Sequence, residues 1–179
     1  MSYRPITDMW ILARAKLKDG RKYYGAYLGG FPERARALLG VSIHDPVLHV
    51  CGGMARYYPY RGGFGPLDKT LDLDPATGPD YLRDAREPLP PGFKAMLADP
   101  PYSAEDAENY EVGREAYPKP NALLKNMLNA VEPGSRVGMI HYILPSPPKE
   151  MSTKFVAAVG VLCGFNNRIR IFSVFERLE

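Results

Sequence analysis

Several short apolar runs in this chain end abruptly at glycine, aspartate or proline, and this pattern constrains the fold more than any other feature of the sequence. The first run, Pro46 to Cys51, is rich in aliphatic side chains and stops at Gly52-Gly53. An unbroken apolar run of this length is typical of a strand buried on both faces, as in a parallel sheet. The two glycines predict a tight turn directly after the strand.

Three further runs end in the same way. We predict strands over Thr70 to Asp74, which Pro75 closes, over Asp80 to Asp84, and over Phe93 to Ala98. The last of these leads into Asp99-Pro100-Pro101-Tyr102, and two successive prolines cannot donate to a strand ladder. The end of this strand is therefore well defined by the sequence.

Helical patterns separate some of these strands. The run Pro32 to Leu39 has a proline near its start and stops at Gly40, as a short helix does. The run Asn121 to Val131 has apolar side chains at helical spacing and is the clearest helix in the sequence. The segment Ser103 to Pro120 is polar and indicates a mobile loop or a frayed helix, whereas Asp8 to Ala15 fits a short helix or a strand equally well.

The C-terminal part of the chain predicts three more strands. Arg136 to Leu144 is the fifth, and Lys154 to Cys163 and Arg168 to Phe175 form a terminal hairpin. Strands that alternate with helices and end in a hairpin predict an α/β fold. We expect a Rossmann-like sheet that is mostly parallel, with an antiparallel hairpin at its C-terminal end.

The composition bounds the class of protein. A chain of 179 residues with 45% hydrophobic and 24% charged residues suits one soluble domain, so we expect a single domain over residues 1–179, with 1–22 as an N-terminal extension. No segment is long enough for a separate target-recognition domain. The net charge of +3 permits a polyanionic partner without requiring one.

The cysteines and histidines suggest no metal site. Cys51 and Cys163 both lie in apolar runs, which predicts neither a disulfide nor a zinc site and fits a reducing, cytoplasmic setting. His49 and His141 lie within strand patterns, where a core or pocket-edge histidine is expected more often than a ligand. The N-terminus has no apolar signal core and no run is long enough to cross a bilayer, so we expect no membrane association.

The residues that follow successive strands are suited to binding one ligand. In an open parallel sheet, ligands collect beyond the carboxyl ends of the strands. The glycines after the first strand allow a ligand to approach the backbone. Asp72 or Asp74, at the end of the second strand, can accept the hydroxyls of a ribose, and Asp84, at the end of the third, can accept an amino group.

With these residues in this order, the chain resembles the class I, Rossmann-like S-adenosylmethionine-dependent methyltransferases. In particular it resembles the amino-methylating branch that has a D/N/S-P-P-Y/F/W tetrapeptide, and the resemblance extends from about Tyr23 to the C-terminus. The family's first motif is abbreviated here and lacks a further glycine. The resemblance implies S-adenosylmethionine as cofactor, held by Tyr24, Gly25, Cys51, Gly52, Gly53, Asp72 (preferred over Asp74), Asp84, Ala85 and Asp99.

The resemblance also implies a role for each residue of the tetrapeptide. The Asp99 carboxylate and the Pro100 carbonyl oxygen would accept the two hydrogens of an acceptor amino group, which localises its lone pair. Pro101 and Pro100 would fix the backbone, and Tyr102 would stack on the base. Because the methyl group needs an in-line approach, positioning and polarisation of the amino group should supply most of the rate.

Several acceptors remain open on the sequence alone. The leading hypothesis is a DNA methyltransferase that acts on the amino group of adenine, which must be flipped out of a duplex. Methylation of the cytosine amino group is a close variant, and RNA or a small amine is an alternative substrate. A non-catalytic subunit of methyltransferase fold is a further alternative. We expect a nucleic-acid partner, with DNA favoured over RNA, and a protein partner or a homo-oligomer is compatible with the small size.

Overall fold

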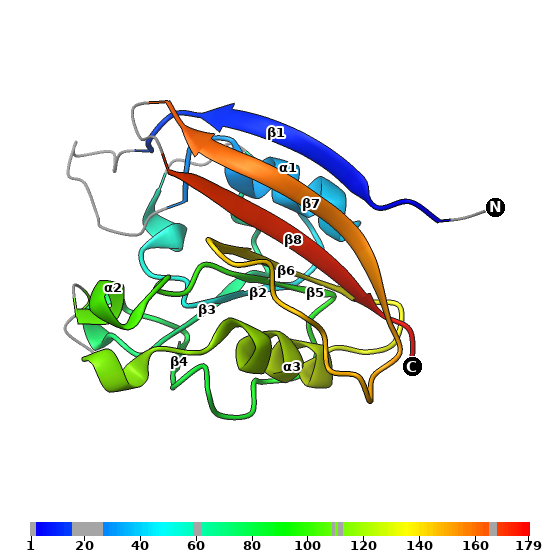
Figure 1. Cartoon of the computed structure of the whole chain (residues 1–179). Coiled ribbons are helices and arrows are strands. Elements are labelled where there is room, and N and C mark those ends of the chain that lie inside the picture. The colour runs from blue at the N-terminus through cyan, green and yellow to red at the C-terminus, as the bar shows by residue number, and fades with distance from the viewer. Residues whose placement is uncertain (1–2, 16–26, 59–61, 109, 111–112, 165–167) are drawn as a thin grey trace.

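The computed structural model describes residues 3–15, 27–58, 62–108, 110, 113–164 and 168–179. Its strands form an eight-stranded sheet in the order β1-β7-β8-β6-β5-β2-β3-β4. The strand bounds are β1 Ile6–Leu12, β2 Val47–Val50, β3 Lys69–Asp72, β4 Tyr81–Leu82, β5 Ala95–Ala98, β6 Arg136–His141, β7 Thr153–Cys163 and β8 Ile169–Arg177. β8 runs antiparallel to its neighbours β6 and β7, and the other neighbouring pairs are parallel. The predicted α/β sheet, mostly parallel with a C-terminal hairpin, is confirmed (Figure 1).

In the ranges that the structure describes, three α-helices and three short 3-10 turns connect the strands. Their bounds are α1 Phe31–Leu39, α2 Ala104–Glu108, α3 Pro120–Ala130, η1 Ala55–Tyr57, η2 Pro75–Thr77 and η3 Arg114–Ala116. α1 ends at Gly40, which has a φ of 72° and donates its N–H to the carbonyl oxygen of Ala37. A left-handed residue after the last turn is the usual end of a helix, and glycine adopts it without strain. The predicted helices over 32–39 and 121–131 are therefore present with small differences at their ends.

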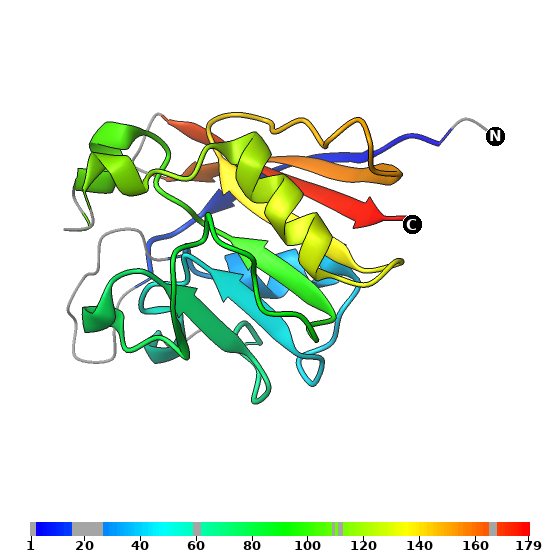
Figure 2. The ribbon, with the colours of Figure 1, turned by 90° about the horizontal axis from the view of Figure 1, so that it is seen from below.

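α1 and α3 cover opposite faces of the sheet, which gives three layers (Figures 1 and 2). Phe31, Ala35 and Leu39 of α1 pack into a buried apolar cluster with side chains of β1, β7 and β8. On the other face, four side chains of α3 are buried in a second cluster with β2, β5 and β6, and they are Leu123, Leu124, Met127 and Leu128. Removal of these apolar side chains from water is the main force that holds the layers together.

The N-terminal segment contributes an edge strand. β1 pairs in parallel with β7, so that Trp10 lies opposite Val161. Trp10 and Leu12 are buried against α1, whereas Met9 and Ile11 face solvent. This alternation decides between the helix and the strand that the sequence allowed, because side chains of a strand point alternately to its two faces.

β2, β3 and β5 are one or two residues shorter than the sequence predicts, and β4 and β6 are shorter by three. β4 has two residues because the side chain of Asp80, rather than its backbone, accepts the N–H of Thr70 on β3. β6 ends at His141, because the N–H of Ile143 donates to His141 Nδ1 instead of continuing the ladder.

A buried charged network ties α1 to the sheet. The Asp68 carboxylate, just before β3, pairs with the Arg36 guanidinium of α1 and lies 3.1 Å from His49 Nε2 on β2. It also accepts the backbone N–H groups of Val47 and Gly65, at 3.1 and 2.7 Å. His49 is thereby explained as a hydrogen-bonded core residue.

Within the ranges that the structure describes, no helix has the length and apolar character needed to cross a membrane.

Candidate functional site

The direction of the chain through the sheet reverses between β2 and β5. From β2 the chain continues outward to β3 and β4, and it then returns to β5 and β6 on the other side of β2. Such a topological switch point opens a crevice at the carboxyl ends of the two central strands, where ligands of open α/β sheets bind. α2, which follows β5, lies at this end of the sheet, away from the C-terminus (Figures 1 and 2).

The backbone turns sharply after β2. Cys51 and Gly53 have φ values of 52° and 48°, and a positive φ is uncommon for a residue with a side chain. Gly52 is buried, and a Cβ there would lie 2.8 Å from the carbonyl oxygen of His49. Gly52 is therefore required by close packing of the turn, while its neighbours Cys51 and Gly53 face the crevice.

The crevice contains a cavity of about 590 Å³, including the part open to solvent. Its wall includes seven of the residues predicted from the sequence, namely Cys51, Gly53, Asp72, Asp84, Ala85, Asp99 and Pro101. The wall is completed by Leu71, Leu73, Arg83, Tyr110, Ala116 and Pro118.

Three carboxylates gather around the Cys51 thiol. Burial raises the pKa of Cys51 well above its usual value, and the negative charges of Asp72, Asp99 and Asp84 raise it further. The acids come from the carboxyl ends of β5, β3 and β4, which lie on either side of β2 and within the same parallel part of the sheet. The cavity wall is therefore acidic, and Arg83, whose guanidinium donates to the Pro88 carbonyl, is its only cation among the described residues.

Asp72 lies at the end of β3 and is fixed by the backbone. Its Oδ2 accepts the N–H of Gly53 at 2.7 Å, and its Oδ1 accepts that of Asp74 at 3.0 Å. Burial raises the pKa of Asp72, and these two hydrogen bonds oppose the rise. Each carboxylate oxygen has a second lone pair that can accept a hydroxyl. Asp74, the alternative acid, instead accepts the N–H of Ala76 in the η2 turn and is not part of the cavity wall.

Asp84 follows β4 and is paired with a neighbour. Both of its oxygens accept the Arg86 Nε–H at 3.0 Å, and the guanidinium holds the pKa of Asp84 below its usual value. The Ala85 carbonyl accepts the side-chain amide of Asn126 on α3 at 2.8 Å. Asp84 is thus ionised and oriented by Arg86 at the rim of the cavity.

Asp99 begins the tetrapeptide after β5. Its backbone N–H donates to the carbonyl oxygen of Val50, which keeps it beside the turn after β2. Its Oδ1 accepts the Tyr102 hydroxyl at 2.7 Å, and its Oδ2 accepts no hydrogen bond from any residue that the structure describes. Burial raises the pKa of Asp99 to about 6, against the opposing effects of Tyr102 and Arg170.

The Tyr102 ring is enclosed by residues of β6 and β8. Tyr142 and His141 lie with their ring centroids 4.6 and 5.4 Å from that of Tyr102. Arg170 of β8 lies over the same ring, with its guanidinium carbon 5.4 Å from the ring centroid. His141 is fully buried, its pKa is lowered by burial to about 4, and it is therefore neutral.

Sequence reasoning missed two parts of this site. Tyr110, Ala116 and Pro118 come from a polar segment without periodicity, which forms α2 and η3 and lies over the cavity. Arg170 and Tyr142 follow strand patterns in which they look like ordinary solvent-facing residues. Only the pairing of β8 with the end of β6, where Ile171 lies opposite His141, brings Arg170 to Tyr102.

The remaining predicted residues lie apart from the cavity wall. Gly52, Pro100 and Tyr102 adjoin wall residues in sequence without lining the cavity themselves. Tyr24 and Gly25 lie outside the described residues. No group of three or more histidine, cysteine, aspartate or glutamate side chains that could hold a metal ion occurs in the described part of the chain.

Comparison with known proteins identifies the fold. No protein-family model matches the sequence, and no curated protein matches it. Among solved structures, TrmN from Thermus thermophilus superposes with a TM-score of 0.57 at 18% identity, over 87% of this chain and 50% of TrmN. A Haemophilus influenzae protein named as a methylase superposes with a TM-score of 0.51 at 12% identity, over 94% of this chain and 99% of that protein.

The chain therefore has the class I, Rossmann-like methyltransferase fold. It spans half the length of TrmN and nearly the whole length of the Haemophilus influenzae protein.

Proposed function

We propose that this protein is an S-adenosylmethionine-dependent methyltransferase that transfers a methyl group to an exocyclic amino group of a base, with adenine in DNA as the leading acceptor. The observation that carries the proposal is the convergence of Asp72, Asp84 and Asp99 on one cavity at the switch point of this fold. The fold neighbours whose names include methylase activity support the same class of reaction.

The residues of the cavity fit the cofactor. Asp72 would hold the ribose hydroxyls, and Asp84 with Ala85 would meet the adenine. The turn at Cys51 and Gly53 would lie against the methionine end. When bound, the cofactor supplies an electrophilic methyl group on a positively charged sulfur.

The charge of the cavity favours this cofactor over the phosphate-bearing nucleotides that many Rossmann-like folds bind. Three carboxylates and one cation line the wall, so the local field attracts a sulfonium and repels a pyrophosphate. The turn after β2 leads into the η1 turn rather than into a long helix whose N-terminus could bind a phosphate.

Asp99 would bind the acceptor. Its free Oδ2 and the adjacent Pro100 carbonyl oxygen are the two acceptors that the tetrapeptide offers to the hydrogens of an amino group. Hydrogen bonds from the amino group to these oxygens increase its electron density, and the two prolines hold the oxygens in place. No strong base is required, because the proton leaves an amine that has already become positively charged.

Tyr102 would orient Asp99. The Tyr102 hydroxyl donates to Oδ1 of the Asp99 carboxylate. This hydrogen bond would fix the rotamer of Asp99 and leave Oδ2 for the acceptor. This role differs from base stacking, which the resemblance implies, and the two are separable by mutation.

A labelled-methyl assay tests the proposed function. The protein is incubated with labelled S-adenosylmethionine and duplex DNA, single-stranded DNA, RNA or nucleosides, and the product is digested to identify the modified base. We expect label in N6-methyladenine of DNA. Label only in RNA or in nucleosides would reassign the acceptor, and cofactor binding without any transfer would support a non-catalytic subunit. A chain that does not bind the cofactor would remove the proposal.

Replacement of Asp72 by asparagine should weaken cofactor binding. An amide offers one acceptor oxygen in place of two, and we expect the dissociation constant to rise roughly tenfold, the usual effect of losing one hydrogen bond to a charged group. Isothermal titration with S-adenosylmethionine measures the effect. Asp74→Asn is the matched control, because Asp74 caps the η2 turn, and equal affinities of the wild-type and Asp72→Asn proteins would contradict the assignment.

Replacement of Tyr102 by phenylalanine should lower kcat by about tenfold with little change in cofactor affinity. The variant keeps the ring between His141, Tyr142 and Arg170 but loses the hydrogen bond to Asp99, which is worth roughly 1.5–3 kcal/mol for a charged acceptor. Single-turnover rates of the wild-type, Tyr102→Phe and Tyr102→Ala proteins measure it. If Tyr102→Phe retains full activity and only Tyr102→Ala is impaired, the ring acts by stacking and the orienting role is wrong.

A further inference from the structure

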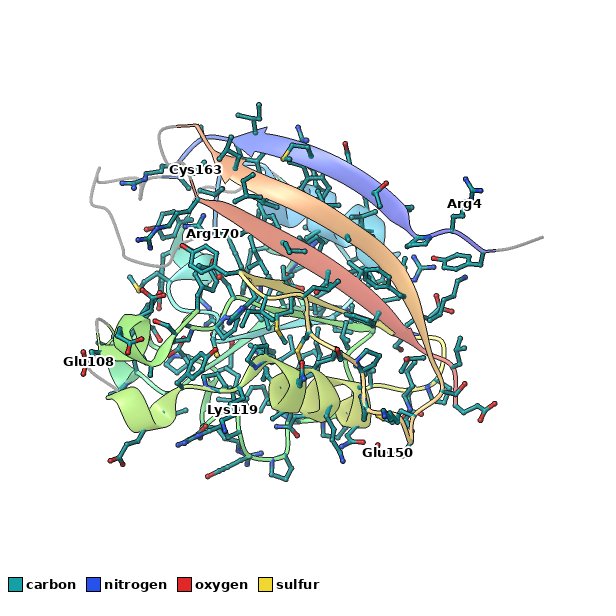
Figure 3. All side chains as sticks on the ribbon, viewed as in Figure 1. Arg4, Glu108, Lys119, Glu150, Cys163 and Arg170 are labelled. Atoms are coloured by element: carbon teal, nitrogen blue, oxygen red, sulfur yellow. The ribbon has the colours of Figure 1, made fainter. Side chains whose placement is uncertain are left out.

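Arg170 is a partly buried cation that forms no ion pair with a carboxylate of the described residues. It lies near the start of β8, on the side of the molecule opposite Glu150 (Figure 3), and its guanidinium lies over the Tyr102 ring. Its Nε is buried and donates to no atom of the described residues. Charged groups removed from water are normally paired, so this arrangement requires an explanation.

The groups around Arg170 supply the compensation. Its guanidinium lies over the Tyr102 ring, whose face carries partial negative charge. Burial opposes the charge on Arg170, but Tyr102 and Asp99 outweigh this effect and raise its pKa. Arg170 is thus held by the same two residues that form the proposed acceptor site.

The positive charge of Arg170 in turn lowers the pKa of Asp99. The titratable groups that act on this carboxylate are the Tyr102 hydroxyl, which donates to it, the Cys51 thiol and Arg170. Arg170 is the only cation in the described part of the chain whose charge acts appreciably on Asp99, and it opposes the effect of burial.

We propose that Arg170 is a positioning residue of the acceptor site, which clamps the Tyr102 ring against Asp99 and keeps the Asp99 carboxylate ionised at neutral pH. This inference rests on the proposed function, since Asp99 must be ionised to accept the hydrogens of an amine. Arg170 itself is not part of the cavity wall. Its contribution passes through Tyr102 and Asp99.

A carboxyl titration tests the inference without any turnover. The full chain is labelled with ¹³C at the aspartate carboxyl groups, and Asp99 is assigned by its absence in Asp99→Asn. In the wild-type protein we expect a midpoint of about 6. In Arg170→Gln we expect the midpoint to rise by roughly one unit, because an opposing charge has been removed. Arg170→Lys retains the charge and should keep the midpoint near that of the wild-type protein.

Arg168→Gln is the matched control, since Arg168 is an exposed arginine just before β8. It should leave the Asp99 midpoint unchanged. Thermal unfolding shows whether each variant is folded, and Arg170→Lys keeps the test informative if Arg170→Gln is unstable. An Asp99 midpoint that is the same in folded Arg170→Gln and in the wild-type protein would overturn the proposal.

The kinetic arm separates this inference from a direct role in substrate binding. In Arg170→Gln the acid limb of the pH profile of kcat/KM should shift to higher pH, by the same amount as the Asp99 carboxyl midpoint. A raised KM for a phosphate-bearing acceptor with an unmoved limb would instead assign Arg170 to the substrate anion and would overturn the positioning role. If the wild-type protein transfers no methyl group, the proposed function fails while the titration still decides whether Arg170 controls Asp99.

Discussion

Asp99→Asn loses methyl transfer while it retains its cofactor. We expect kcat to fall by roughly 10²–10³, the usual effect of removing one preorganised electrostatic contact in an active site. The asparagine side chain keeps the size of the aspartate but presents an amide N–H group where the acceptor needs an oxygen. The dissociation constant for S-adenosylmethionine should stay within about threefold of the wild-type value, because Asp72 and the turn after β2 are unchanged.

The pH dependence of the wild-type enzyme gives the same assignment independently. The pKa of Asp99 is raised by burial to about 6, so the carboxylate is largely ionised at pH 7 and above. As the pH falls through 6, the carboxyl group gains a proton and becomes a donor, and methyl transfer should decrease with it. A rate that stays constant between pH 5 and pH 8 would contradict this role.

Stability distinguishes loss of function from loss of fold. Because the folded pKa of Asp99 lies above that of an unfolded aspartate, the folded protein binds more protons between pH 4 and 6. Ionised Asp99 therefore costs stability at pH 7, and Asp99→Asn should unfold at or above the wild-type temperature. Asp45→Asn is the matched control for activity, since Asp45 lies at the opposite end of β2 and, among the described residues, accepts hydrogen bonds only from Ser42. It should keep its activity.

The sequence predicted those parts of the fold whose side chains are buried on a regular period. α3 follows this rule at helix spacing, and β2 and β5 were predicted because they are buried at every position and read as unbroken apolar runs. β1 was not predicted unambiguously, because only its last residues, around Trp10 and Leu12, alternate between buried and exposed, and its pairing partner β7 lies some 150 positions later in the chain. Local pattern cannot reveal a partner at that distance, and the choice between helix and strand was made by packing of Trp10 against α1 and β8.

The candidate site was predictable to the extent that it lies at strand ends. Parallel strands bring their carboxyl ends to one edge of the sheet, so the sequence alone predicts that Asp72, Asp84 and Asp99 lie close together. Arg170 could not, because β8 is antiparallel and contributes its first residues rather than its last to that edge. The segment that contains Tyr110 and Pro118 could not be predicted to line the cavity either, because its sequence has no repeating pattern.

Asp68→Asn is expected to cause the largest loss of stability in the molecule. Asp68 is fully buried and accepts hydrogen bonds from Arg36, from His49 and from two backbone amides. Its removal leaves the Arg36 guanidinium, which is 5% exposed, without a counterion between α1 and the sheet. Breaking a buried pair by removing one partner costs about 3–5 kcal/mol, and urea unfolding at pH 7 measures the cost.

The pH dependence of this effect follows from the sign of the pKa shift. Burial alone would raise the pKa of Asp68, but the hydrogen bonds from His49 and Arg36 outweigh burial and lower it. The stabilisation is therefore complete above the pKa of an unfolded aspartate, about 4, and is lost as the pH falls through the lower folded value. The difference between wild-type and Asp68→Asn should accordingly be constant from pH 5 to 8 and shrink in acid.

The Lys125–Glu150 pair is the matched control for Asp68, because both of its side chains are more than half exposed. Glu150→Gln should not change the urea midpoint measurably, since solvent and side-chain entropy cancel most of the attraction in exposed pairs. If Asp68→Asn also left the urea midpoint unchanged, the network would not hold α1 to the sheet. β2 is joined to this network through the Val47 N–H and the His49 ring. If the network contributed nothing, the cavity at the end of β2 would have to be positioned by apolar packing alone.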